Sequence, residues 1–279
     1  MSSQNPNRVR HSVIAGSWYP GNERALRQTI ERYIQAVPPT KLEGDLIGLI
    51  APHAGYMYSG QVAAYAYKAL ENLHFERVVI ISPMHRLYAG PFVTTDQDYY
   101  ETPLGLVKVD REMVTLIDQA IGVRRVGEDD EHSLEIQLPF LQYMLGDFML
   151  TPLMMGEQDY EHCRVLGDAV GKIFTAKNTL LVASTDLSHF HNYDTAVRMD
   201  KIVLDQIAKY DPEGLAKVLA MGQAEACGGG PVIAVMIAAR HLGANHAQIL
   251  KYANSGDVTG DRSGVVGYGA GVLYRMLAS

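Results

Sequence analysis

Each of three histidines stands a few residues beyond an apolar run of strand length: His53 after Leu46–Ala51, His85 after Val78–Ser82, and His189 after Thr179–Ser184. The carboxyl ends of neighbouring parallel strands lie along one edge of an α/β sheet, so residues far apart in sequence meet there. We therefore predict that the three histidines share one pocket. Because imidazole nitrogens bind metals and carry protons near neutral pH, this pocket is a candidate metal or redox-active centre.

One cysteine, Cys227, is placed to join these histidines. It lies in the glycine-rich stretch 226–231, directly before a predicted helix. Backbone N–H groups and the positive end of the helix dipole at such a place favour a thiolate over a thiol. A thiolate is a strong metal ligand, which makes Cys227 a candidate ligand, although a glycine run is equally typical of a hinge or a plain turn.

His53 and His85 share a second feature, a proline at the end of the preceding strand. Pro52 stands directly before His53, and Pro83 stands two residues before His85. Proline has no N–H to donate to a strand ladder, so each imidazole is predicted to lie where a strand gives way to a loop. A structural role is the commoner explanation for any single histidine. The repeated pattern favours metal ligation by His53 and His85.

Proton transfer has two candidate histidines, His189 and His132. Asp186, three residues before His189, has two explanations that stay open: it orients a neighbouring imidazole by accepting the second N–H of that ring, or it caps the following turn. His132 stands just before a predicted amphipathic helix and is a candidate proton carrier or substrate contact. Ser133 and the acidic residues beside it have a sufficient structural role in capping that helix.

Two aromatic residues are candidates for the wall of a ligand pocket. They are Trp18, the only tryptophan of the chain, and Tyr56, three residues after His53. An aromatic ring near a pocket more often simply packs, so this explanation also stays open. The second cysteine, Cys163, falls in a predicted helix and is expected to be a small buried hydrophobe.

Apolar runs of strand length alternate with helix-like stretches along the chain. The predicted strands are Leu46–Ala51, Val78–Ser82, Thr151–Met155, Thr179–Ser184, Gln248–Ala253 and Val265–Leu273. The predicted helices are Glu23–Ala36, Gln61–Asn72, Arg111–Ile121, Ser133–Met144, Tyr160–Phe174, Asp194–Tyr210, Pro212–Ala220 and Pro231–Leu242. This alternation predicts an α/β fold, a single domain over residues 1–279 with a central, mostly parallel or mixed sheet flanked by helices.

Capping residues and helix breakers set several of these boundaries. Asn22 and Asp211 are predicted N-caps, and Gly243 is predicted to stop the last helix. The stretch Asp96–Leu106 contains tyrosines, a proline and a glycine, fits neither a helical nor a strand period, and is predicted to form a loop and turn.

Composition narrows the class of protein. Of the 279 residues 47% are hydrophobic and 20% are charged, as in an ordinary globular protein, and two cysteines make no disulfide framework. The net charge of −7 argues against nucleic-acid binding, which rewards a basic surface. No run approaches the roughly 18 apolar residues of a membrane span, and the polar opening lacks the apolar stretch of a secretory signal. We therefore expect a cytoplasmic protein that binds no membrane.

These residues and three further motifs closely resemble the Memo family, whose bacterial and archaeal members are called AmmeMemoRadiSam system protein B. The motifs are Gly16-Ser17-Trp18-Tyr19-Pro20, Glu131-His132-Ser133-Leu134-Glu135-Ile136-Gln137-Leu138-Pro139 and Asn254-Ser255-Gly256-Asp257. That family is similar in fold to the class III extradiol dioxygenases, which hold non-haem Fe(II) with two histidines and one carboxylate and open catechol rings with dioxygen. The resemblance covers nearly the whole chain and implies an extradiol-dioxygenase-like fold.

The resemblance also implies roles for individual residues. His53 and His85 correspond to the two ligand histidines, His189 corresponds to the acid/base histidine, and Cys227 stands where the carboxylate ligand would be. A thiolate is softer than a carboxylate and can itself be oxidised, so ring cleavage does not follow from the resemblance. Softness favours Cu(I) or Zn(II), while iron remains compatible with a suitable geometry. The implied cofactor is iron or copper.

Three functional hypotheses follow. In the first, His53, His85 and Cys227 bind a metal for redox or oxygenase-like chemistry. His189 then moves protons beside them, oriented by Asp186. In the second, the protein is a binding module that recognises a small molecule, a peptide or a partner, and the family name implies an AMMECR-type domain protein and a radical S-adenosylmethionine (SAM) enzyme as companions. In the third, Cys227 is a nucleophile with His189 as its base, which leaves the other two histidines unexplained.

Overall fold

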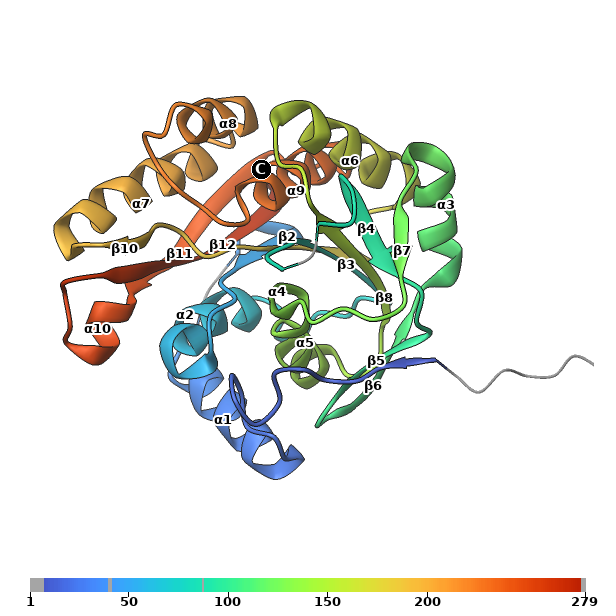
Figure 1. Ribbon diagram of the computed structural model, residues 1–279, viewed down its shortest axis with the longest axis horizontal. Helices are drawn as coiled ribbons and strands as arrows, with labels where there is room; N and C mark the ends of the chain where they lie inside the picture. The colour runs from blue at the N-terminus through green and yellow to red at the C-terminus, as the bar shows by residue number, and fades with distance from the viewer. Residues whose placement is uncertain (1–7, 40–41, 87, 277–279) are drawn as a thin grey trace, which may run out of the picture.

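A mixed sheet runs through the centre of the molecule (Figure 1). The computed structural model describes residues 8–39, 42–86 and 88–276. The strands of these ranges are β1 (Val9–Arg10), β2 (Gly44–Ala51), β3 (Arg77–Pro83), β4 (Phe92–Thr95), β5 (Tyr99–Thr102), β6 (Gly105–Val109), β7 (Arg124–Val126), β8 (Met149–Met155), β9 (Thr179–Ser184), β10 (His189–His191), β11 (His246–Asn254) and β12 (Val265–Met276). Their order across the sheet is β1-β5-β6-β8-β3-β9-β2-β12-β10, with β11 paired to β12 and β4 paired to β7 and β8.

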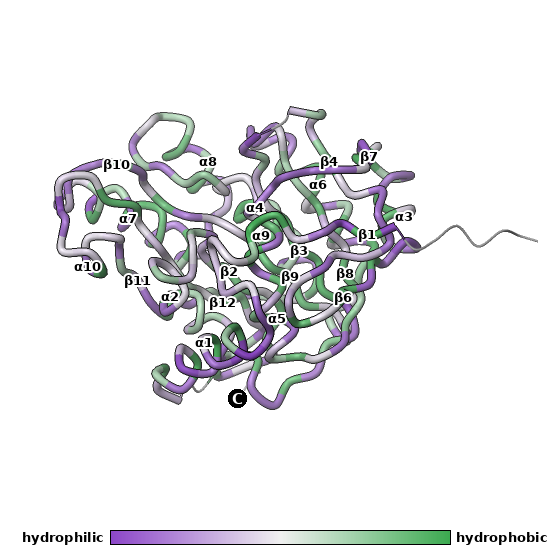
Figure 2. The backbone as a smooth tube through the Cα atoms, turned by 60° about the horizontal axis from the view of Figure 1, so that its bottom comes forward, coloured by the Kyte–Doolittle hydropathy of each residue, from purple (hydrophilic) through white to green (hydrophobic). Residues whose placement is uncertain are grey.

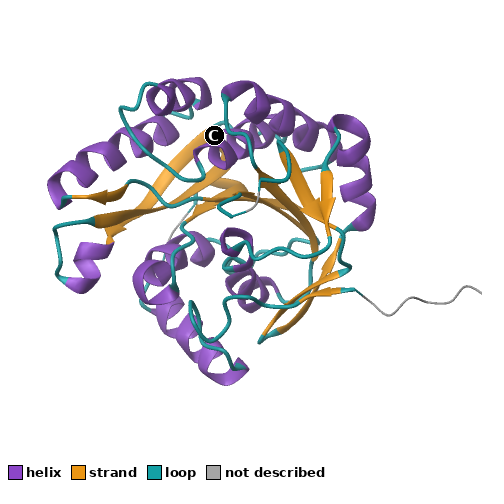
Figure 3. Cartoon of the chain, viewed as in Figure 1, coloured by secondary structure: helices purple, strands orange, loops and turns teal. Residues whose placement is uncertain are grey.

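Helices cover both faces of this sheet (Figure 3). They are α1 (Glu23–Gln35), α2 (Tyr56–Lys68), α3 (Arg111–Ile121), α4 (His132–Glu135), α5 (Leu138–Leu145), α6 (Tyr160–Ile173), α7 (Tyr193–Ala208), α8 (Pro212–Ala220), α9 (Gly229–His241) and α10 (Ser255–Thr259). On one face α1, α2 and α5 bury Leu26, Tyr67 and Phe140. On the other face α6 and α7 bury Leu166 and Val203. The predicted α/β fold with a mixed sheet between helices is confirmed.

The inner strands β8, β3, β9 and β2 are parallel. Val79 of β3 is aligned with Thr151 of β8 and with Leu181 of β9, and Val182 of β9 is aligned with Leu49 of β2. These strands read as continuous apolar runs because helices cover both of their faces. The carboxyl ends of β2, β9 and β3 therefore lie side by side at one edge, which is the arrangement expected from the histidine spacing.

Helix α9 is apolar around its whole circumference and appears green in the hydropathy view (Figure 2). It packs closely on α6 at two glycines. A Cβ on Gly167 would lie 2.7 Å from the carbonyl oxygen of Ala234, and a Cβ on Gly171 would lie 2.5 Å from Cβ of His241. This close packing fixes the middle and the end of α9 against α6, and Cys227 lies two residues before the start of α9.

Three predicted segments differ from the structure. The stretch Asp96–Leu106 is not a plain loop, because β5 and the start of β6 form an antiparallel hairpin in which Tyr100 pairs with Val107. Tyr100 and Thr102 are buried in alternation with more exposed neighbours, a strand pattern too short to distinguish from a loop by sequence. The helix predicted over Gln61–Asn72 instead spans α2, beginning directly after Gly55.

The helix predicted over Ser133–Met144 is two helices, α4 and α5. Pro139 is the second residue of α5, and because it has no N–H it cannot continue the hydrogen bonding of α4. The N-cap of α4 is Glu131, whose carboxylate accepts the N–H of Ser133 at 3.0 Å. Ser133, the expected cap, donates its hydroxyl to the carbonyl oxygen of Pro83 at 2.8 Å.

Other local predictions are confirmed. Asn22 and Asp211 accept backbone N–H groups at the starts of α1 and α8, and Gly243 follows α9 with a positive φ of 97°. Cys163 is fully buried, and both cysteines are free. In the described ranges no helix combines the length and the apolar character needed to cross a membrane. The first seven residues of the polar opening lie outside the described residues.

Candidate metal centre

Three potential metal ligands converge at the carboxyl edge of the inner strands. His53 follows β2, His85 follows β3, and Cys227 lies in the connection between α8 and α9. One ligand atom from each of the three side chains lies within 4.8 Å of the others, and His53 Nε2 is 3.0 Å from Cys227 Sγ. The structure thus brings the three predicted ligands together.

Hydrogen bonds to Ser184 determine which nitrogen of His53 is free. Ser184 Oγ lies 2.6 Å from the carbonyl oxygen of Ser133, which can only accept, so the hydroxyl hydrogen is donated there. Ser184 Oγ must then accept from Gln137 Nε2 at 2.7 Å and from His53 Nδ1 at 3.0 Å. Burial lowers the pKa of His53 and keeps the ring neutral. His53 Nε2 therefore presents a lone pair towards Cys227.

Glu131 orients His85 in a similar way. His85 Nδ1 donates to Glu131 Oε1 at 2.9 Å, and the backbone N–H of His85 donates to Oε2 at 2.6 Å. Burial alone would raise the pKa of Glu131, but these bonds and the one from Ser133 outweigh it and lower the pKa to about 2. The ionised carboxylate keeps a hydrogen on Nδ1, so His85 Nε2 is the ring nitrogen available to a metal.

The surroundings of Cys227 favour the thiol over the thiolate. Burial, followed by the nearby Asp186 carboxyl, raises the pKa of Cys227. Its sulfur accepts the backbone N–H of Asp186 at 3.2 Å. The predicted preference for a thiolate is therefore wrong for the unligated cysteine, because α9 begins only at Gly229 and its dipole does not offset the loss of water around the sulfur.

The carboxylate of Asp186 binds the loop after β2. Its Oδ1 accepts the backbone N–H of His53 at 2.7 Å, and burial raises the pKa of Asp186 to about 7. In the described ranges no hydrogen bond joins Asp186 to His189 or to the turn that follows it, and its Oδ2 instead lies 3.9 Å from Nε2 of another imidazole, that of His53. Asp186 thus links the end of β9 to the end of β2, rather than bonding to residues near it in the sequence.

His189 is oriented by backbone and lies in a strained segment. Its Nδ1 donates to the carbonyl oxygen of Leu187 at 2.9 Å, which leaves a lone pair on Nε2, and burial lowers the pKa of His189. The next residue, Phe190, has a positive φ of 62°, rare for a bulky residue, at an irregularity in the pairing of β10 with β12. Asp200 of α7 supports this segment by accepting the N–H of Ser188 at 2.8 Å.

We expect Asp200→Asn to flatten the pH dependence of stability. Asp200 is fully buried, accepts Tyr252 OH at 2.7 Å, and has a pKa raised by burial. A carboxyl whose pKa is raised in the folded state stabilises the fold fully below the unfolded pKa of about 4 and loses that contribution as pH rises through the folded pKa. Urea unfolding at pH 4–8 should show the free energy of unfolding of the wild type falling relative to the variant.

Asp205→Asn is the matched control, because Asp205 lies on the same helix, is about half exposed and pairs with Lys201 on the surface. It should keep the wild-type slope. A constant difference between wild type and the Asp200 variant across this pH range would contradict the expectation.

His132 lies beside the predicted ligands and against Trp18. The centroid of its ring is 4.6 Å from that of His85 and 4.4 Å from that of Trp18. His132 Nδ1 is buried and has no hydrogen-bond partner among the described residues, and burial lowers the pKa of His132 to about 4. The ring is therefore neutral and a weak base, and its Nδ1 is free to accept a hydrogen bond from a ligand. Tyr56 is buried and donates its hydroxyl to the carbonyl oxygen of Ile136 at 3.0 Å.

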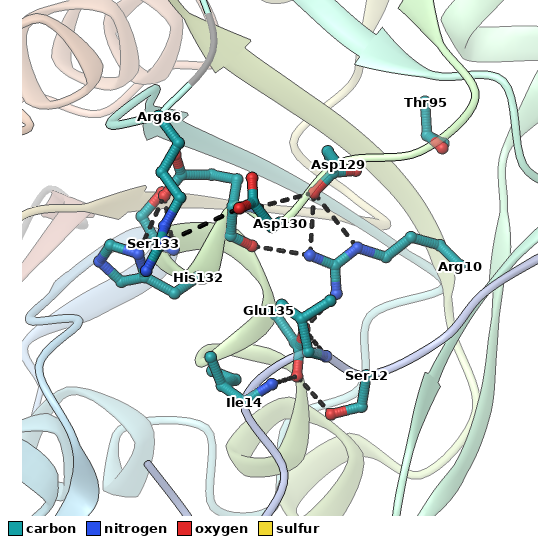
Figure 4. A network of polar contacts seen from close by, with 12 residues as sticks. Arg10, Ser12, Ile14, Arg86, Thr95, Asp129, Asp130, His132, Ser133 and Glu135 are labelled. Atoms are coloured by element: carbon teal, nitrogen blue, oxygen red, sulfur yellow. Dashed lines mark hydrogen bonds and ion pairs between the residues drawn. The ribbon is translucent and has the colours of Figure 1, made fainter. Parts of the chain in front are cut away.

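A buried polar network holds the segment that carries Trp18 (Figure 4). Glu135 of α4 accepts hydrogen bonds from Arg10, from Ser12 Oγ at 2.6 Å and from Tyr19 OH at 2.7 Å. The side chains of Arg10 and Glu135 are 2% and 0% exposed. The network ties residues 10–19 to α4, which brings the indole to the rim of the site.

Most of the predicted site residues line one cavity of about 1170 Å³. Those that do are Trp18, His53, Tyr56, His85, His132, Asp186 and His189. Cys227 is not among the lining residues. A volume of this size accommodates a ligand larger than a typical metabolite.

The sequence did not predict that Glu131 and Ser184 would be hydrogen-bond partners of the histidines. Glu131 stands next to His132 in one of the three motifs, and its sequence position suggested only capping. Ser184 is the last residue of the predicted strand before His189. A polar residue at the end of an apolar strand was the one local signal that could have identified it.

Comparisons with known proteins all point to one family. The sequence model of a family described as Memo-like protein matches residues 10–272. A MEMO1 family protein of Nitrosopumilus maritimus is 38% identical over 94% of this chain and 98% of its own length, and one of Methanopyrus kandleri is 38% identical over 95% and 99%. A MEMO1 family protein of Pyrobaculum aerophilum is 36% identical over 96% of this chain and its own full length. The chain therefore belongs to the Memo family.

Proposed function

We propose that this chain binds a redox-active iron or copper ion through His53 Nε2, His85 Nε2 and Cys227 Sγ. The observation that carries the proposal is the convergence of one ligand atom from each of these three side chains within 4.8 Å of the others. Ser184 and Glu131 support it, because each holds the hydrogen of an imidazole on the nitrogen that faces away. Two imidazoles and a thiolate are chemically suited to these ions, since imidazole binds both metals and a thiolate binds Cu(I) and iron.

The bound ion would supply one-electron chemistry, and the residues of the chain would handle protons and access. Cys227 would release its thiol proton on ligation. His189 carries its free lone pair on Nε2 and would accept a proton from a substrate in the large cavity. We infer a metal-dependent oxidoreductase of the cytoplasm, with the dioxygenase-like architecture that the family resemblance implies.

Anaerobic metal loading tests the proposal. Metal-free protein is incubated with Fe(II) or with Cu(I) in the absence of oxygen, desalted and analysed for metal content. We expect close to one ion per chain for at least one of the two metals. Protein that retains neither metal would refute the proposal.

Ser184→Ala is expected to weaken metal binding by about 10- to 100-fold, the usual cost of losing the group that orients a ligand imidazole. The change removes the acceptor for His53 Nδ1 while all three ligands stay in place. Anaerobic titration of metal-free protein against a competing chelator measures the affinity. Ser82→Ala is the matched control, since Ser82 is also a buried serine at a strand end but its hydroxyl has no partner in the described chain. Equal affinities of the two variants would contradict the role of Ser184.

The size of the large cavity favours a second candidate function, a binding module without turnover. Met57, Tyr58 and Phe190 line the cavity and are exposed apolar side chains, as at many sites that contact a peptide or partner. The companions would be an AMMECR-type domain protein and a radical SAM enzyme. Co-purification of metal-free protein with either companion supports this function, and its absence argues against it.

A further inference from the structure

A second cavity of about 940 Å³ lies next to the candidate metal centre. Its walls come from α8, from the starts of α6 and α9, and from residues 224–227. Several of the wall residues are small or apolar, including Ala216, Ala220 and Ile233. Cys227 and His189 also line it, so this cavity reaches the same site as the large one.

Cys227 faces the second cavity. It is partly exposed, it lines the second cavity, and it does not line the large one. His53 and His85 have the opposite placement, because they line only the large cavity. The candidate metal centre therefore lies between the two cavities. Its imidazoles line the large cavity, and its cysteine lines the second cavity.

The two cavities differ in charge. The charged residues that line the large cavity are Arg32, Arg86, Asp186 and Asp261. Those that line the second cavity are Asp159, Glu213, Lys217 and Glu225. The large cavity thus has two basic and two acidic groups, whereas the second has three acidic groups against one basic group. A cation is attracted more strongly to the second cavity.

We propose that the second cavity is the route by which the metal cation reaches the centre, and that Cys227 is the first ligand the cation meets. The inference rests on the proposed metal-binding function, because a buried metal site needs a path of access. The acidic residues of this route are exposed to solvent, so they act on the rate of association and salt weakens their effect.

The association rate of Co²⁺ with the metal-free protein tests the route, followed by the sulfur-to-cobalt absorption band in stopped flow. Glu213→Gln removes a negative charge and should slow association by roughly threefold at low salt, whereas Lys217→Gln removes a positive charge and should speed it by a similar factor. Both effects should nearly vanish at 1 M salt, where the Debye length is about 3 Å. Opposite signs from two charge changes in one cavity separate steering from general damage to the fold.

Variants that change the width or the charge of one cavity complete the test. Ala220→Trp narrows the second cavity and should slow association, whereas Thr29→Trp and Asp261→Asn alter the large cavity and should leave the rate unchanged. Unchanged rates in all variants of the second cavity, or slowing confined to the large-cavity variants, would overturn the route. A wild-type protein that binds neither Fe²⁺ nor Cu⁺ would instead overturn the proposed function.

Discussion

Replacing Cys227 by alanine is expected to lower the affinity of the protein for iron or copper by more than about 100-fold. Loss of an outer partner of a ligand alone costs about 10- to 100-fold, and the sulfur would be a direct ligand 3.0 Å from His53 Nε2. The two histidines that remain offer too few ligands for a closed site. Anaerobic equilibrium titration against a competing chelator measures the change.

Cys163→Ala is the matched control for this prediction. Cys163 is the other free thiol of the chain, but it is fully buried in α6 and its sulfur contacts the carbonyl oxygen of Gln158 at 3.5 Å. The metal affinity of this variant should match that of the wild type. A Cys227→Ala protein that still binds one ion with wild-type affinity would show that the sulfur is not a ligand.

Glu135→Ala is expected to destabilise the protein by about 3–5 kcal/mol, the usual cost of removing one partner from a buried ion pair. Arg10 would lose one of its buried carboxylate partners. Ser12 and Tyr19 would lose the acceptor of their hydroxyl groups, and so would the backbone N–H of Val13. Urea unfolding monitored by circular dichroism measures the free energy of unfolding.

Two further variants give reference values for the loss of stability expected in Glu135→Ala. Tyr19→Phe removes a single hydrogen bond to the same carboxylate and should cost about 1.5–3 kcal/mol, the usual range for a bond to a charged group. Glu101→Gln breaks the ion pair with His11, whose side chains are 45% and 77% exposed, and should change stability by less than about 1 kcal/mol. A Glu135 variant no less stable than the Glu101 variant would mean that the network does not support the fold.

The helices and strands that were predicted well from the sequence are those whose environment is uniform along their length. Strand β9 matches its prediction from Thr179 to Ser184, because a strand covered on both faces is apolar at every position. The hairpin of β5 and β6 was missed because its strands are short and only Tyr100 and Thr102 of β5 are buried. The break between α4 and α5 was missed although Pro139 marks it in the sequence.

The location of the candidate site followed from chain topology. Parallel strands that end at one edge must bring His53, His85 and His189 to that edge, and the sequence shows the three strand ends directly. The sequence did not indicate which of the two cavities Cys227 lines. That placement depends on contacts with distant residues, since the backbone of Cys227 bonds to Asp186 and to the side chain of Gln158.

The sequence by itself determined the types of the candidate ligands, the position of the histidines after strands and of Cys227 before a helix, the α/β class and the Memo resemblance. Only the tertiary structure decided which groups orient the imidazoles and which groups keep their protons. The partner of His53 Nδ1 lies 131 residues away at Ser184, and the partner of His85 lies 46 residues away at Glu131. Local periodicity carries no information about such distant contacts. The protonation of Cys227 and Asp186 depends on how far the whole fold removes water from them, and burial of that kind exists only after the chain has packed.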